Sequence, residues 1–154
     1  MFEYSDIIYA PIRGETVKSA DIHDPAFSEE MLGKGMAIIP VEGKVYAPFD
    51  GKVSMVFTTK HAVTLVSNKG TEVLIHVGLD TVRLKGKYYK SYVETGELVN
   101  KGDLLLEFDM EAVSAAGYDT ITPIVICNSD DYKTIKCITG KKVVPGNSVM
   151  KLRR

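Results

Sequence analysis

The 154-residue sequence is poor in cysteine, histidine and tryptophan: it has two cysteines, three histidines and no tryptophan. Cys127 and Cys137 do not form a C-x-x-C pair, and no secretory signal precedes them, so we expect reduced thiols in the cytoplasm. No apolar run approaches the roughly 20 residues that a membrane helix needs. We therefore expect a cytoplasmic protein with no direct membrane insertion.

Excess charge of one sign is also missing. Nineteen lysines and arginines face 20 aspartates and glutamates, for a net charge of −1 at pH 7. This balance argues against nucleic acid or an anionic membrane as a partner. The hydrophobic content of 45% is ordinary for a globular protein. The length predicts a single domain over residues 1–154.

What the sequence does contain is a series of short β-rich runs, separated by glycine and proline turns about every eight to twelve residues. This spacing predicts an all-β fold, an antiparallel β-sandwich or flattened barrel. We expect helical turns at 28–31, ending near Gly33, and at 110–116 after an Asp109 cap. The predicted strands are 6–10, 15–19, 36–40, 44–47, 51–57, 62–67, 72–77, 88–93, 104–108, 121–127 and 149–152.

An internal echo indicates a duplicated β motif. Ala10-Pro-Ile-Arg-Gly14 recurs as Ala47-Pro-Phe-Asp-Gly51, each followed by an alternating strand. The valine, glycine and leucine spacing over 93–104 is similar to the turns of small biotinyl- or lipoyl-type domains. We therefore expect a barrel-sandwich hybrid-like arrangement.

Two histidines, His61 and His76, lie on either side of the turn Ser67–Gly70. The flanking segments are rich in β-branched residues and predict a hairpin. If the loop is 68–69, the two imidazoles face each other directly, whereas a loop centred on 69–70 makes them diagonal neighbours on one face. Only a one-residue loop change places them on opposite faces.

The surroundings make the pair asymmetric. His76 interrupts an apolar run, and Gly78 leaves one side of its ring open. On the first register Thr59 lies opposite Gly78, on the face of His61, where its hydroxyl can fix the His61 tautomer. Adjacent imidazoles resist double protonation, so one ring should offer a free lone pair at neutral pH.

Such a pair suits zinc ligation, proton shuttling or nucleophilic transfer of an anionic group. A zinc-dependent hydrolase needs a third ligand. His23 lies on a loop and no H-E-x-x-H is present, although Asp24 or Asp80 could substitute. A non-catalytic carrier of the lipoyl type needs a lysine at an exposed hairpin tip, and none is evident.

The segment Gly70–Val82, with a glycine, an apolar run, His76, Gly78 and Thr81, resembles the active-site signature of a known family. This is the glucose-family enzyme IIA of the bacterial phosphoenolpyruvate-dependent sugar phosphotransferase system. The resemblance runs from about Ile7 to Leu152 and includes the segments 24–35, 47–51, 60–62 and 122–128.

The resemblance implies a phosphotransferase without cofactor or metal. His76 would accept a phosphoryl group from the carrier protein HPr and pass it to a cysteine of a IIB domain. His61 would donate a hydrogen bond to the phosphate, and Thr59 would orient His61. Backbone N–H groups near Gly78 could help to hold the phosphate.

A protein that exchanges phosphoryl groups with other proteins needs an apolar, accessible surface around the nucleophile. We expect Phe27, Leu32, Phe57, Leu74 and Gly78 to contribute to it. Asp24 and Asp80 would rim this surface and attract a basic HPr, either by long-range charge or through its arginine. Phe57 and Leu74 could instead be core residues, and the aspartates could simply cap turns. We expect a monomer.

Overall fold

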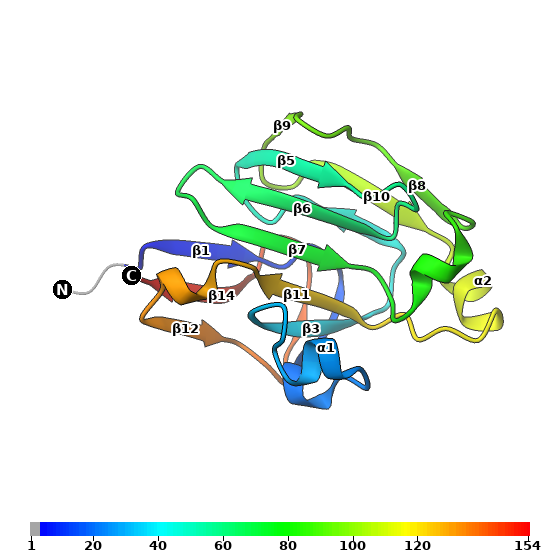
Figure 1. Ribbon diagram of the computed structural model, residues 1–154, viewed down its shortest axis with the longest axis horizontal. Helices are drawn as coiled ribbons and strands as arrows, with labels where there is room; N and C mark the ends of the chain where they lie inside the picture. Colours follow the sequence, from blue (N-terminus) through cyan, green and yellow to red (C-terminus); the bar gives the residue numbers. More distant parts are fainter. Residues whose placement is uncertain (1–3) are drawn as a thin grey trace.

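The computed structural model describes residues 4–154 and is built almost entirely of antiparallel strands (Figure 1). The strands of this part of the chain are β1 Asp6–Tyr9, β2 Gly14–Lys18, β3 Lys34–Pro40, β4 Lys44–Tyr46, β5 Gly51–Val56, β6 Ala62–Ser67, β7 Glu72–His76, β8 Tyr89–Ser91, β9 Leu98–Val99, β10 Leu104–Phe108, β11 Thr122–Ile126, β12 Thr134–Cys137, β13 Lys142–Val143 and β14 Ser148–Arg153. The predicted all-β class is confirmed.

Helical structure is confined to short pieces. The two α-helices are α1 Pro25–Ser28 and α2 Met110–Ala115, and the 3-10 turns are η1 Ser19–Asp21, η2 Thr81–Leu84 and η3 Ser129–Asp131. Asp109 caps α2 as predicted, its carboxylate accepting from the Ala112 amide at 3.1 Å. The helical turn predicted at 28–31 is wrong, because Asp24 accepts from the Ala26 amide and Pro25 opens the helix earlier.

The strands form three sheets, the largest with the order β13-β2-β3-β11-β7-β6-β5-β9. The smaller sheets are β1-β14-β12 and β4-β10-β8. Counted inward from the two edges of the large sheet, equivalent positions are held by β13 and β9, β2 and β5, β3 and β6, and β11 and β7. The sheet therefore has an internal twofold pattern with β11 and β7 at its centre.

Backbone hydrogen bonds show that this pattern is the predicted duplication. The Tyr9 amide donates to the Pro48 carbonyl at 3.0 Å, and the Tyr46 amide donates to the Pro11 carbonyl at 2.7 Å. These bonds join the two copies of the Ala-Pro motif reciprocally. Equivalent bonds run from Ala10 to Asn147 and from Ala47 to Asp103, and from Gly146 to Ala10 and Gly102 to Ala47.

Alternate side chains of the large sheet enter two different apolar clusters. The inner core combines side chains from all three sheets, including Met150, Leu106 and Ile75. The smaller outer cluster consists of Ile22, Phe27, Ala37, Ala62, Leu74, Leu79, Ile121 and Val125. This outer cluster covers the other face of β3, β6, β7 and β11, and it supports the histidine site.

Both ends of the described chain lie on the left in Figure 1, beside β1 and β14. The Arg154 amide donates to the Ser5 hydroxyl at 2.8 Å, and the Ser5 amide donates to the Leu152 carbonyl at 2.7 Å. Within residues 4–154, no helix has the length and apolar character that a membrane crossing requires.

Candidate functional site

The β6–β7 hairpin differs from both predicted registers. Ala62 pairs with His76, and Ser67 and Thr71 close a three-residue loop. Gly70 ends this loop with a φ of +93°, the left-handed conformation that such loops place on glycine. Because the register differs by one residue from each prediction, His61 would face away from His76 if β6 extended back to it.

His61 avoids this outcome because it precedes the strand. Lys60 has a φ of +59°, which turns the chain just before β6 begins at Ala62. The ring centroids of His61 and His76 then lie 4.8 Å apart, with the ring planes at 82°. The predicted pairing of the two imidazoles is therefore present, although His61 lies just before β6, where its carbonyl accepts from the Val77 amide at 2.7 Å.

The Nδ1 atom of His76 lies 2.7 Å from the Gly78 carbonyl oxygen. Since a carbonyl only accepts, this nitrogen carries the proton when the bond forms, and Nε2 keeps its lone pair. Gly78 has a φ of +90°, and a Cβ there would lie 2.5 Å from Thr81 Cγ2 and 2.9 Å from the Asp119 carbonyl oxygen. Only glycine allows this turn to place its carbonyl under His76.

Two backbone N–H groups of this turn already donate hydrogen bonds within the protein. The Gly78 N–H donates to the Ile121 carbonyl and the Leu79 N–H to the Asp119 carbonyl, each at 3.0 Å. These two N–H groups are therefore not free to bind a phosphate, and the expectation that backbone N–H groups near Gly78 help to hold it stays a prediction. Gly78 contributes through its carbonyl and its lack of a side chain.

Thr59 contacts His61 as the sequence predicted, but its predicted position opposite Gly78 is wrong, because it lies in the turn before β6. Its hydroxyl is 2.7 Å from His61 Nδ1. When the hydroxyl donates, His61 Nδ1 is the acceptor and Nε2 carries the proton. In this tautomer His61 presents a hydrogen-bond donor from its other nitrogen.

Both imidazoles favour the neutral form. Burial and, to a smaller extent, the neighbouring His76 lower the pKa of His61 to about 4, and the His61 side chain is only 2% exposed. Burial also lowers the pKa of His76, while the Gly78 carbonyl, Asp24 and Asp80 oppose that shift. At neutral pH the site therefore contains two uncharged rings.

The predicted apolar residues take different positions. The Phe27 ring lies 5.1 Å from the His76 ring, and the Phe57 ring 5.5 Å from the His61 ring. Phe27 and Leu74 are buried in the outer cluster, and Phe57 packs against it. The alternative interpretation of Phe57 and Leu74, as packing residues, therefore also agrees with the structure. Leu32 is 47% exposed and does not belong to the outer cluster.

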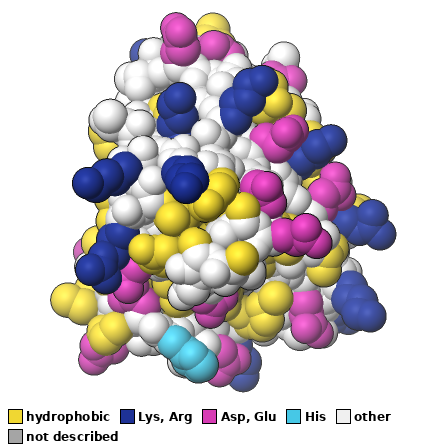
Figure 2. Space-filling model, turned by 90° about the vertical axis from the view of Figure 1, so that its right-hand side faces the viewer, with side chains coloured by type: hydrophobic (Ala, Val, Ile, Leu, Met, Phe, Trp, Pro, Cys, Tyr) yellow, Lys and Arg dark blue, Asp and Glu magenta, His cyan; other side chains and the backbone are white. Residues whose placement is uncertain are grey.

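Both predicted aspartates act electrostatically on His76, because each raises its pKa. Asp24 also caps α1, and Asp80 adopts a left-handed φ of +59° just before η2. Figure 2 shows the end of the molecule on the right of Figure 1, where hydrophobic side chains gather among both acidic and basic ones. This end is therefore mixed in charge and not uniformly acidic.

Three further residues were not predicted from the sequence. Met31 and Val82 are 71% and 51% exposed and follow α1 and Asp80, respectively. Tyr89 is buried and donates to the Val77 carbonyl next to His76. Exposed apolar side chains in short turns have no periodicity, and nothing in the sequence linked Tyr89 to a residue 12 positions earlier.

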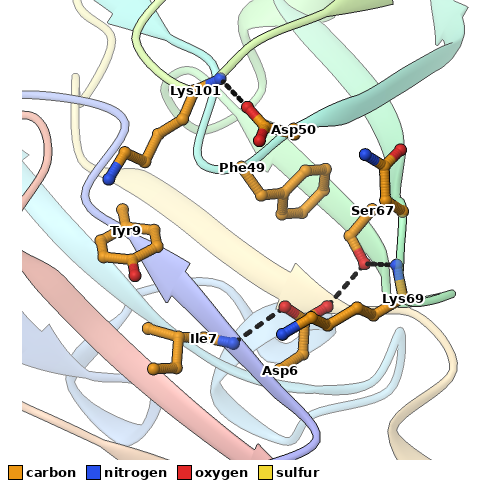
Figure 3. A pocket seen from close by; sticks show the side chains of 9 residues that line it. Asp6, Ile7, Tyr9, Phe49, Asp50, Ser67, Lys69 and Lys101 are labelled. Atoms are coloured by element: carbon orange, nitrogen blue, oxygen red, sulfur yellow. Dashed lines mark hydrogen bonds between the residues drawn. The ribbon is translucent and has the colours of Figure 1, made fainter.

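No group of three or more histidine, cysteine, aspartate or glutamate side chains within residues 4–154 is arranged to hold a metal ion. A cavity of about 440 Å³ lies at the other end of the β6–β7 hairpin and is lined by Asp6, Tyr9, Phe49, Lys69 and Lys101, among others (Figure 3). Its Asp6 carboxylate accepts from the Ser67 hydroxyl, which joins β1 to the β6–β7 turn. None of its lining residues belongs to the histidine site.

An uncharged imidazole with one nitrogen held and the other free, beside a second imidazole, is an arrangement that suits nucleophilic group transfer. The family model described as "phosphoenolpyruvate-dependent sugar phosphotransferase system, EIIA 1" matches residues 6–132. The chain belongs to this family, and its role is phosphoryl transfer as a phosphotransferase component of that system. Neither the comparisons nor the described side chains support the zinc hydrolase.

The relatives agree in fold and sequence. A glucose-specific EIIA component of Staphylococcus epidermidis is 46% identical over 92% of this chain and 85% of its own length. A β-glucoside-specific EIIBCA component of Dickeya chrysanthemi is 49% identical over 90% of this chain, which spans only 22% of that protein. The structure of glucose permease IIA from Mycoplasma capricolum matches with a TM-score of 0.89 and 35% identity, over 95% of this chain and 94% of that one.

Proposed function

We propose that His76 is the phosphorylated residue, that phospho-HPr is the donor, and that a IIB cysteine is the acceptor. The observation that carries this proposal is the 2.7 Å contact of His76 Nδ1 with the Gly78 carbonyl oxygen. It leaves Nε2 as the nucleophile on a ring that is neutral and partly accessible. Phosphoryl transfer requires mainly such positioning and charge stabilisation.

Each of the two steps is a displacement at phosphorus. The Nε2 lone pair forms a bond to phosphorus as the P–N bond to the HPr histidine breaks, and the bonding electrons return to that histidine. The IIB thiolate then attacks the same phosphorus, and the P–Nε2 bond breaks towards His76. The proton stays on His76 Nδ1, hydrogen-bonded to the Gly78 carbonyl, throughout, so neither step needs an added acid or base.

His61 and Thr59 act as the supporting pair. Thr59 donates to His61 Nδ1, so that His61 Nε2–H is available to a phosphoryl oxygen. The 4.8 Å separation of the two ring centroids supports this role, because it would bring the donor within reach of a group bound to His76. A donor fixed in place by burial stabilises the charge that spreads over the phosphoryl oxygens in the transition state.

The partner surface, in this proposal, has a packed base and an exposed edge. Phe27, Phe57 and Leu74 support the two rings from beneath, whereas Leu32, with Met31 and Val82, supplies exposed apolar area. Asp24 and Asp80 add negative charge close to His76, which favours a basic HPr. Residues 1–154 then act as one EIIA domain, monomeric and cytoplasmic.

The test is the intact mass after incubation with phosphoenolpyruvate, enzyme I and HPr. The wild type is expected to gain one acid-labile phosphoryl group, and His76→Ala none. His23→Ala is the matched control, because it removes an exposed imidazole outside the pair. Phosphate uptake by His76→Ala, or none by the wild type, would contradict the proposal.

A further inference from the structure

The carbonyl between His76 and Gly78 is held by two side-chain hydroxyl groups. Thr81 donates to the Val77 oxygen at 2.8 Å, and Tyr89 donates to the same oxygen at 2.9 Å. The N–H of the same peptide, on Gly78, donates to the Ile121 carbonyl at 3.0 Å. Both polar groups of this peptide are therefore hydrogen-bonded, and its carbonyl oxygen accepts two bonds although one would satisfy it.

Tyr89 reaches this carbonyl from a different sheet. It begins β8 in the sheet β4-β10-β8, and its ring stacks on Phe108 of β10 with a centroid distance of 5.8 Å and an interplanar angle of 15°. Thr81 is fully buried and Tyr89 nearly so. The Tyr89 hydroxyl thus links the sheet β4-β10-β8 directly to Val77, the residue that follows β7 and His76.

The segment before Tyr89 has an unusual backbone. Lys85 and Tyr88 both have positive φ values, 54° and 76°, which cost about 1 kcal/mol or more for a residue with a side chain. Gly86 lies against Thr59, since a Cβ on Gly86 would be 3.7 Å from the Thr59 carbonyl oxygen. The turn that delivers Tyr89 therefore also borders the residue that orients His61.

We propose that Tyr89 is a positioning residue for phosphoryl transfer, acting through the Val77 carbonyl on the Gly78 carbonyl that holds His76 Nδ1. The inference rests on the proposed function of His76. If the Val77–Gly78 peptide rotates, the next carbonyl, that of Gly78, rotates away from Nδ1. The ring can then take the other tautomer, in which Nε2 carries the proton and cannot attack.

Burial supports this role for the hydroxyl. It raises the pKa of Tyr89 to about 12, so the group stays protonated and can only donate to the Val77 carbonyl under working conditions. A buried carbonyl that loses one of two donors keeps its hydrogen bond but gains rotational freedom. When the Tyr89 hydroxyl is removed, we therefore expect the His76 tautomer with the proton on Nδ1 to be less populated, while the fold is retained.

The test uses Tyr89→Phe, which keeps the ring and its stacking on Phe108. Single-turnover transfer from saturating phospho-HPr is expected to be about fivefold slower, the loss that one buried hydrogen bond typically causes, with unchanged affinity for phospho-HPr. Nitrogen NMR of the unphosphorylated protein should show a larger share of His76 with the proton on Nε2. Tyr88→Phe, which removes a neighbouring hydroxyl without a hydrogen bond among those of the described residues, should match the wild type in both measurements.

A second variant separates positioning from simple stability. Thr81→Val should shift the His76 tautomer in the same direction, and the double variant should slow transfer by more than the product of the single effects. If Tyr89→Phe lowers stability alone, with its transfer rate and nitrogen spectrum equal to those of Tyr88→Phe, the inference is wrong. The tautomer measurement needs no phosphate, so it can fail or succeed independently of whether His76 is phosphorylated.

Discussion

His61→Gln is expected to become phosphorylated to completion but to pass its phosphoryl group to the IIB cysteine about 100-fold more slowly than the wild type. The glutamine fills much of the volume of a side chain that is 2% exposed, so the site should remain folded. Its amide can donate a hydrogen bond, but Thr59 can no longer set which atom faces the phosphate. Excess phosphoenolpyruvate drives phosphorylation of the variant to completion. The loss of the His61 hydrogen-bond donor therefore shows in the rate of transfer to the IIB cysteine.

The measurement is a rapid-quench time course of the isolated phosphoprotein mixed with a IIB domain. His23→Gln is the control, since it makes the same chemical change at an exposed position. Thr59→Val should fall between the wild type and His61→Gln, because it leaves the imidazole in place without its orienting hydroxyl. Onward transfer by His61→Gln at the wild-type rate would remove His61 from the mechanism.

The second large effect concerns stability at acid pH. Burial and His76 hold the pKa of His61 at about 4 in the folded protein, below its usual value of 6.5. Between these values the unfolded chain binds a proton that the native state does not, so the free energy of unfolding falls as the pH falls. The stabilisation present above pH 6.5 should decrease by about 3 kcal/mol once the pH reaches about 4. The lowered pKa of His76 acts in the same direction.

Urea unfolding at a series of pH values, on the wild type and His61→Gln, tests this expectation. Carboxylates also contribute to acid unfolding, but they contribute equally to both proteins. The stability advantage of the wild type over His61→Gln should therefore shrink as the pH is lowered from neutral. A difference that stays constant down to pH 4 would mean that the native protein protonates His61 as readily as the unfolded chain.

Much of the scaffold could be predicted because its strands carry strong local signals. The runs 62–67 and 104–108 are observed with the predicted bounds, since β-branched and apolar residues fill them and turn residues flank them. The strands β9 and β13 have two residues each, and no periodicity exists over such a length. The strand β12 has only exposed and half-buried positions, so its pattern was too weak to predict.

The site was predicted from its residue types, although its geometry was not. The spacing of His61 and His76 suggested a hairpin pair, and the ring centroids do lie 4.8 Å apart. The loop, however, has three residues, and His61 lies before β6, next to Lys60 with its left-handed φ. A lysine in that conformation has no sequence signature, since asparagine or glycine is the usual occupant. Register and backbone handedness here depend on tertiary packing.

The internal duplication explains the scaffold but not the chemistry. Leu74 and Val125 pair at the centre of the large sheet. Two residues further along each strand direction lie His76 in one half and Cys127 in the other. Cys127 is an exposed residue, but partial desolvation and the nearby Glu72 carboxylate raise the pKa of its thiol, which disfavours the nucleophilic thiolate. The two halves therefore share one backbone pattern, but only one of them carries the His61–His76 pair and the Gly78 turn on which the proposed phosphoryl transfer depends.

The most direct test of the central claim is the location of the phosphoryl group on the imidazole. Long-range proton–nitrogen NMR of the nitrogen-labelled protein, phosphorylated by phosphoenolpyruvate, enzyme I and HPr, distinguishes the two ring nitrogens of each histidine. The structure predicts phosphorylation of His76 alone, with phosphorus on Nε2 and the proton retained on Nδ1. Phosphorus on Nδ1 of His76, or on His61 or His23, would contradict the account.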